Sequence, residues 1–242
     1  MWHDNLRGIY YIALKDMRTY YLKPPAISWG IVFPVAWILA FYLRSPRAFE
    51  ELVPGLIAMT ILFSTTAAEA VVINFELRIG SLERLLLAPI TVSAVLIGKV
   101  LGGALFGLLM TALVTLGSII GLGLYVNVPY LLLVVVPSLF AFSAMGALLC
   151  VLVKEVFEAQ TLANLPRFLM MFLSGVFYPI SAMPWPLRYV SYVLPLTYTV
   201  DGLRRVLTSG ENAVILFDSM ILIIVAVVLI VPAVRLLHRR FV

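Results

Sequence analysis

Acidic side chains inside apolar runs are the groups in this sequence that could do chemistry at membrane depth. Glu69 lies well inside such a run, whereas Asp218 lies near the end of another. Thr65 and Thr66 precede Glu69 by about one helical turn and add polar groups nearby. A charge at the centre of a bilayer costs about 2.5–3.5 kcal/mol on insertion scales, so Glu69 must face protein or water, or be protonated. Two interpretations stay open: Glu69 lines a pathway, or it makes a structural hydrogen bond to a neighbouring helix.

Other catalytic arrangements are missing from the sequence. Cys150 is the single cysteine, and His3 and His238 lie near opposite ends, so no cluster of metal ligands is expected. The apolar runs lack the grouped nucleophiles and bases of a membrane hydrolase. The "GKV" at 98–100 lacks the upstream glycine and the following Ser or Thr of a Walker A motif. We therefore expect no enzyme and no cofactor bound by this chain. We also expect no nucleic acid as a partner, because the sequence lacks a basic cluster interleaved with stacking aromatic residues.

The composition is typical of a polytopic membrane protein. Of 242 residues, 63% are hydrophobic and 12% are charged, and the mean hydropathy is +1.08. Soluble domains are closer to half apolar and a quarter charged. A spanning helix needs about 20 apolar residues, which predicts one all-α domain over 1–242 with six spans. These are 26–43, 54–73, 92–121, 130–152, 162–180 and 213–234.

The distribution of Lys and Arg predicts that both termini are cytoplasmic. With that orientation the inner side holds twelve basic residues and the outer side five, which follows the positive-inside rule. The inner set is Arg7, Lys15, Arg18, Lys23, Arg78, Arg84, Lys99, Lys154, Arg167, Arg235, Arg239 and Arg240. The outer set is Arg44, Arg47, Arg188, Arg204 and Arg205. No small-residue cleavage site follows the first run, so we expect that run to remain as an anchor in the plasma membrane.

Two further segments have amphipathic patterns. Residues 1–25 are predicted to form a helix on the inner leaflet, with a soluble partner as the alternative. Its apolar face comprises Leu6, Ile9, Tyr10, Ala13, Met17, Tyr20 and Tyr21. Residues 180–208 contain Pro184, Pro186 and Pro195, which prevent one continuous helix. We interpret them as short re-entrant helices in the outer leaflet. The alternative is an ordinary outer loop with interfacial aromatic residues.

The segment 74–90, "NFELRIGSLERLLLAPI", is charged but lies between two apolar runs. Ile79, Leu82 and Leu86 share one helical face, while Glu83 and Arg84 point elsewhere. This pattern predicts a cytoplasmic helix over 76–88 that docks into a groove of a soluble partner. The alternative is a plain interfacial linker.

Two motifs resemble those of the permease subunits of ABC-2 type exporters. "FELRIGSLERLLLAPITVSAVLIGKVL" resembles the family's "E…G(T/S)LE-LL-(A/S)P" segment, which is followed by "GK" at the start of the third span. "FLSGVFYPISAMPWPLRYVSYVLPLTYTVDGLRRVL" resembles the family's segment after the fifth span. The likeness covers the whole chain and indicates a prokaryotic membrane context.

The resemblance implies that two permease chains pair as a homodimer and bind two copies of a cytoplasmic ABC ATPase, which carries ATP and Mg²⁺. The coupling residues it nominates are Glu76, Arg78, Ser81, Leu82, Glu83, Arg84 and Leu86. The translocation-path residues it nominates are Thr65, Thr66, Glu69, Phe168, Met171, Phe172 and Phe177. The apolar and aromatic lining favours an amphiphile, lipid-like, glycan or drug-like, as the exported substrate. The alternatives are a proton-coupled carrier that uses Glu69 and a membrane scaffold without transport.

Overall fold

The described part of the chain is a helical bundle. The computed structural model describes residues 2–23, 27, 32, 35–37, 39–40, 42–43, 49–123, 126–153, 156–208 and 212–241. Half of the predicted first span, 26–43, therefore lies outside the described residues. In order, the helices are α1 (Trp2–Asp16), the π-helical η1 (Met17–Tyr21), α3 (Phe49–Arg78), α4 (Ser81–Leu86), α5 (Val92–Leu122), α6 (Val128–Leu152), α7 (Val156–Leu173), η3 (Ile180–Ala182), α8 (Trp185–Val193), α9 (Pro195–Thr208) and α10 (Asn212–Phe241).

Three of the helices that the structure describes are long and apolar enough to cross a membrane. They span Val92–Leu122, Val128–Leu152 and Ala213–Arg239 in α5, α6 and α10. Shorter apolar stretches, Glu51–Thr66 and Thr161–Leu173, lie in α3 and α7. The prediction of an all-α membrane protein is thus confirmed for the described residues, while the count of six spans stays a prediction.

The predicted fifth span, 162–180, extends too far. Helix α7 ends at Leu173, and Gly175 has a φ of 80°. This left-handed conformation suits glycine and ends helices. The chain then turns back onto α3, where a Cβ on Gly55 would lie 2.6 Å from the carbonyl oxygen of Val176. Helices η3, α8 and α9 follow within 180–208.

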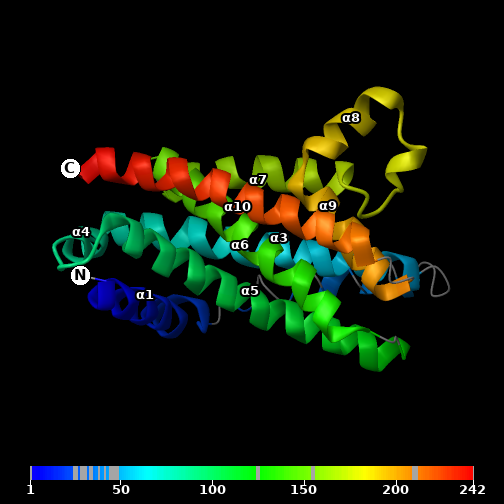
Figure 1. Ribbon diagram of the computed structural model, residues 1–242, viewed down its shortest axis with the longest axis horizontal. Coiled ribbons are helices and arrows are strands. Elements are labelled where there is room, and N and C mark those ends of the chain that lie inside the picture. Colours follow the sequence, from blue (N-terminus) through cyan, green and yellow to red (C-terminus); the bar gives the residue numbers. More distant parts are fainter. Residues whose placement is uncertain are drawn as a thin grey trace.

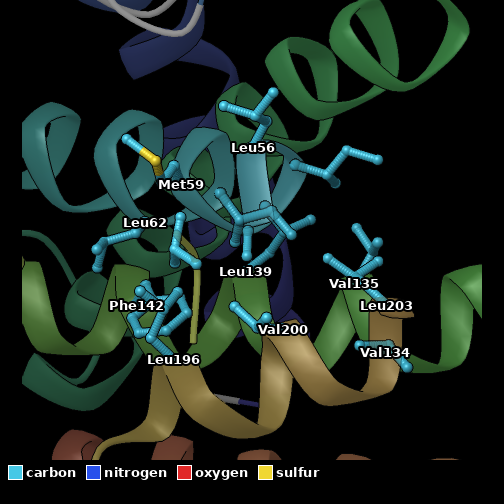
Figure 2. Packing of buried hydrophobic residues seen from close by; sticks show 14 of the residues in the cluster. Leu56, Met59, Leu62, Val134, Val135, Leu139, Phe142, Leu196, Val200 and Leu203 are labelled. Carbon is cyan, nitrogen blue, oxygen red and sulfur yellow. The ribbon is translucent and has the colours of Figure 1, made fainter. Parts of the chain in front are cut away.

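The largest apolar core holds α3 against α6 and α9. Figure 2 shows side chains from the three helices pointing into one cluster. The labelled members are Leu56, Met59 and Leu62 of α3, Val134, Val135, Leu139 and Phe142 of α6, and Leu196, Val200 and Leu203 of α9. Close packing of this kind is a main source of helix association in lipid. It fixes the rotation of α3 and therefore the directions of Thr65, Thr66 and Glu69.

Helix α1 packs along the beginning of α5, beside the end of the bundle where α4 and both termini lie (Figure 1). The close approach requires glycine, because a Cβ on Gly98 would lie 3.0 Å from the Cβ of Ile12. Ile12 and Ala13 are buried, whereas Leu6 and Tyr10 are exposed. The apolar face predicted for residues 1–25 is therefore divided between two kinds of surroundings, and its contact with the inner leaflet stays a prediction. Ala13 and Tyr21 of that set pack on protein, whereas Leu6 and Tyr10 form an exposed stripe with Trp2.

Candidate functional site

A sharp turn separates α3 from α4. Ile79 still donates its N–H to the Phe75 carbonyl at 3.1 Å, but Gly80 has a φ of 68° and starts a new helix. Helix α4 is only six residues long. After it, Thr91 caps α5, with its hydroxyl accepting from the Ala94 N–H at 3.2 Å. The single helix predicted over 76–88 is thus divided at Gly80 between the end of α3 and the short helix α4. We call the connection 79–91, which includes α4, the coupling loop, after the role that its sequence predicts.

The coupling loop presents a mixed surface of apolar and charged groups. Ile79 is 53% exposed and Leu87 is 86% exposed, and Glu83 and Arg84 are exposed beside them. Large apolar side chains next to both signs of charge are typical of protein contacts. The surface is therefore suited to contact with another protein.

Two of the predicted coupling residues, Leu82 and Glu76, face inward. Leu82 is fully buried in a cluster with Ile12, Ile73 and Val95. It therefore anchors the loop to its own chain, and the prediction that it shares an exposed docking stripe with Ile79 is wrong. Glu76 is also fully buried. Of the remaining predicted residues, Arg78 is exposed, and Ser81 and Leu86 are partly buried.

Four charged side chains meet at the base of the coupling loop. Lys99 of α5 lies 3.1 Å from Asp16 Oδ2 of α1 and 2.6 Å from Glu76 Oε2 of α3. Lys15 lies 3.1 Å from Asp16 Oδ1 and also pairs with Glu76 Oε1. The two positive charges of the lysines equal the two negative charges of the carboxylates in number. Burial raises the pKa of Asp16, and the charge of Lys99 opposes that rise. We call these four residues the charge cluster.

The charge cluster ties α1 to both helices that carry the coupling loop. Glu76 lies in the last turn of α3 before the loop, Lys99 lies in the second turn of α5 after it, and each pairs with α1. At the far end of α1, the Asn5 side-chain oxygen accepts from the Thr91 N–H at 3.0 Å. Helix α1 therefore contacts the coupling loop near its N-terminal end, through Asn5, and contacts α3 and α5 beside the loop at its C-terminal end, through Lys15 and Asp16.

Glu69 lies at a junction of helices inside the chain. Its Oε1 accepts from the Tyr21 hydroxyl at 3.2 Å, from the Gly103 N–H at 3.1 Å and from the Ser143 hydroxyl at 3.4 Å. The side chain is fully buried. Glu69 thus joins η1, α5 and α6 to α3, which is the geometry of the structural interpretation.

The remaining predicted path residues do not form one lining. Thr65 and Thr66 are buried and bond to carbonyls of their own helix. Phe168 and Phe172 line an open groove of about 1130 Å³ along α7, whereas Met171 is buried behind it. Phe177 is partly buried, with its ring centroid 6.0 Å from that of Phe172.

Arg167 was not singled out from the sequence, where it counted only as an inner cation. Its guanidinium is fully buried. The Nε donates to Thr66 Oγ1 at 2.5 Å, and Nη1 donates to Asn164 Oδ1 at 2.9 Å. Asp16 was missed as well, although an acidic residue within an amphipathic pattern was a visible signal. Partners so distant in sequence could not be read from spacing.

Comparison with known proteins identifies the chain's relatives. Residues 7–208 match the model of the family described as ABC-2 type transporter. The chain is 28% identical over 214 residues to the "Probable multidrug ABC transporter permease YbhS" of Escherichia coli (strain K12), covering 86% of this chain and 56% of that protein. It is 27% identical over 215 residues to the "Inner membrane transport permease YadH" of the same strain, covering 81% and 83%. It is 25% identical over 204 residues to the "Putative transport permease ycf38" of Cyanophora paradoxa, covering 75% and 68%.

The chain spans little more than half the length of YbhS, whereas it spans most of YadH. The family match extends from α1 through α9 and includes the coupling loop and the segment after α7. These are the regions whose motifs carried the resemblance. The chain belongs to the ABC-2 type transporter family.

Proposed function

We propose that this chain is the permease subunit of an ATP-driven exporter and that it works as a homodimer with two copies of a separate ABC ATPase. The observation that carries this proposal is the coupling loop, with Ile79, Glu83, Arg84 and Leu87 exposed at the end of the bundle where both termini lie. The family membership supports it, because YbhS and YadH are named as permeases. ATP and Mg²⁺ bind to the partner subunit.

The coupling loop would seat in a cytoplasmic groove of the ATPase. Exposed apolar side chains anchor such contacts, and charges set their register. Because the charge cluster joins the loop to α1, α3 and α5, movement of the ATPase would shift all three helices together. This gives a physical route from nucleotide hydrolysis to the membrane.

The groove along α7 would accept the substrate, an amphiphile with an apolar portion. It is lined by Leu162, Leu165, Phe168, Leu169, Phe172, Leu173 and Leu187, with Val153 and three polar side chains, Glu158, Thr161 and Asn164. Concave, mostly apolar surfaces with a few polar groups are typical of small-molecule sites. The enclosed position of Glu69 gives no support to the alternative of a proton-coupled carrier.

The test is charge reversal on the coupling loop. Glu83→Arg changes an exposed side chain, so membrane insertion and the unfolding temperature should be unchanged. Co-purification of the ATPase, or substrate-stimulated hydrolysis, should fall. The matched control is Asp201→Arg on α9, which reverses a partly exposed carboxylate far from the loop. Equal complex yield and equal hydrolysis for both variants would remove Glu83 from the docking surface. If Leu87→Asp also behaved normally, the coupling proposal would fail.

A further inference from the structure

The guanidinium of Arg167 is a buried cation with an unused donor. Its Nη2 is buried and has no hydrogen-bond partner among the described residues, and no described carboxylate forms an ion pair with it. The guanidinium lies 5.9 Å from the Phe63 ring centroid. A charged group is costly at membrane depth, and a structural arginine would normally use its five donors. The observed contacts, Thr66 and Asn164, are both neutral.

The same guanidinium lies directly behind the wall of the α7 groove. Asn164, which accepts from Nη1, is one of the residues that line the groove. Phe168 also lines the groove, and its ring contacts Phe63 at 6.0 Å between centroids. Arg167 is therefore separated from the groove by one layer of side chains.

The groove has a polar end and an apolar end. Glu158, Thr161 and Asn164 follow at intervals of three residues and lie near the beginning of α7. Leu169, Phe172 and Leu173 lie near its end. Glu158 lies six residues from Asn164, about 9 Å along the helix axis, and it is exposed. Its charge is therefore partly screened from the Asn164 end of the groove.

We infer that the α7 groove binds an amphiphile with an anionic headgroup, such as a phosphate or carboxylate, whose acid group takes the place of Asn164 as the partner of Arg167. Its apolar chain lies over Leu165, Phe168 and Phe172. Charge complementarity selects this ligand: a buried arginine with open donors matches a phosphate or carboxylate in charge and in fork geometry. The inference gives the substrate class of the proposed exporter and rests on that proposal for its biological meaning, but the binding site itself can be tested without the ATPase.

The test measures thermal stabilisation of the purified chain in dodecyl maltoside micelles. Dodecyl phosphate, dodecylphosphocholine and inorganic phosphate are titrated separately, and phosphatidic acid is added as a two-chain anion. We expect saturable stabilisation by dodecyl phosphate and none by inorganic phosphate. Saturable stabilisation by dodecyl phosphate alone would identify a single-chain ligand. Saturable stabilisation by phosphatidic acid as well would show that the site also binds a two-chain membrane lipid. Equal shifts with dodecyl phosphate and dodecylphosphocholine would overturn the inference.

Substitutions separate the anion site from the fold. Arg167→Gln keeps an amide that can bond Thr66, and it should weaken dodecyl phosphate about ten- to a hundredfold, the range expected for losing a charge-assisted hydrogen bond. Asn164→Ala should bind the ligand as well or better, because the competing partner of Nη1 is gone. Arg205→Gln, which removes a guanidinium paired with Asp201 on α9, is the matched control. Unchanged affinity in Arg167→Gln would overturn the inference, as would a loss in Asn164→Ala equal to that in Arg167→Gln.

A second copy of this chain is the competing occupant of the groove. In a Cys150→Ala background, Leu165→Cys places a thiol on the groove wall. If a second copy fills the groove, the introduced cysteines cross-link chain to chain with a yield that dodecyl phosphate leaves unchanged, and the inference fails. If the ligand fills it, labelling of the cysteine by a maleimide falls as dodecyl phosphate saturates. Failure of ATPase co-purification would refute the proposed function and leave these binding results standing.

Discussion

Removal of the Lys99 ammonium should destabilise the chain strongly, because Lys99 is the buried cation that both acidic residues of the charge cluster share. Lys99→Met keeps a long apolar side chain and removes two ion pairs. It leaves Asp16 and Glu76 buried, with only the partly exposed Lys15 to compensate. Breaking a buried ion pair by removing one partner costs about 3–5 kcal/mol. At about 2–4 °C per kcal/mol for a chain of this size, the unfolding temperature should fall by roughly 6–20 °C.

The assay is thermal unfolding followed by intrinsic fluorescence in detergent, together with limited trypsin digestion. Loss of the charge cluster should also loosen α1, so cleavage after the exposed Arg18 should become faster. The triple variant Asp16→Asn, Glu76→Gln, Lys99→Met should recover most of the loss, since no buried charge is then unpaired. Lys15→Met should cost less than Lys99→Met because water reaches Lys15. An unchanged unfolding temperature and unchanged cleavage in Lys99→Met would refute this reasoning.

Three further predictions follow from the described contacts. Glu69→Gln should keep the fold, because the new amide oxygen can still accept from Tyr21 and Gly103. Glu69→Leu should lower the free energy of unfolding by about 1–3 kcal/mol. Equal denaturation midpoints for the two variants would contradict this prediction. Gly103→Ala should lower the free energy of unfolding by about 1–3 kcal/mol, because the new Cβ would lie 2.6 Å from Ser143 Oγ. Gly117→Ala is the control and should leave the free energy of unfolding unchanged, because nothing lies within 4 Å of its Cβ position. In intact cells carrying Cys150→Ala, a membrane-impermeant maleimide should label Tyr189→Cys on α8 and spare Glu83→Cys on α4, and the reverse pattern would invert the topology.

The helical class and three of the six apolar spans could be predicted from the sequence, because they depend on composition and run length. Long runs such as 92–121 and 130–152 correspond closely to α5 and α6. Helix ends were harder to predict, since they depend on single residues. Gly80 and Gly175 adopt left-handed conformations that divide or end helices, and glycine is common enough in membrane helices to hide this role.

The buried contacts of the candidate site residues could not be predicted from the periodicity of the sequence. A single-helix pattern placed Leu82 on an outward stripe, but the stripe's neighbours include Ile12, Ile73 and Val95 from three other helices. The sequence could require that Glu69 be paired or protonated, yet its partners Tyr21, Gly103 and Ser143 lie 48, 34 and 74 residues away. Such pairings arise from tertiary packing, for which one sequence gives no local signal.

The most direct test of the central claim is site-specific photocross-linking from the coupling loop. A benzophenone side chain is introduced at Leu87, which is 86% exposed, and, as the control, at Tyr189 on α8. After illumination of intact cells, the adducts are purified and identified by mass spectrometry. We expect Leu87 to cross-link to an ATP-binding-cassette subunit, with a yield that changes when nucleotide is trapped, and Tyr189 not to do so. Absence of this subunit from the Leu87 adducts, in cells where the chain is inserted and folded, would contradict the proposed contact between the coupling loop and an ATPase.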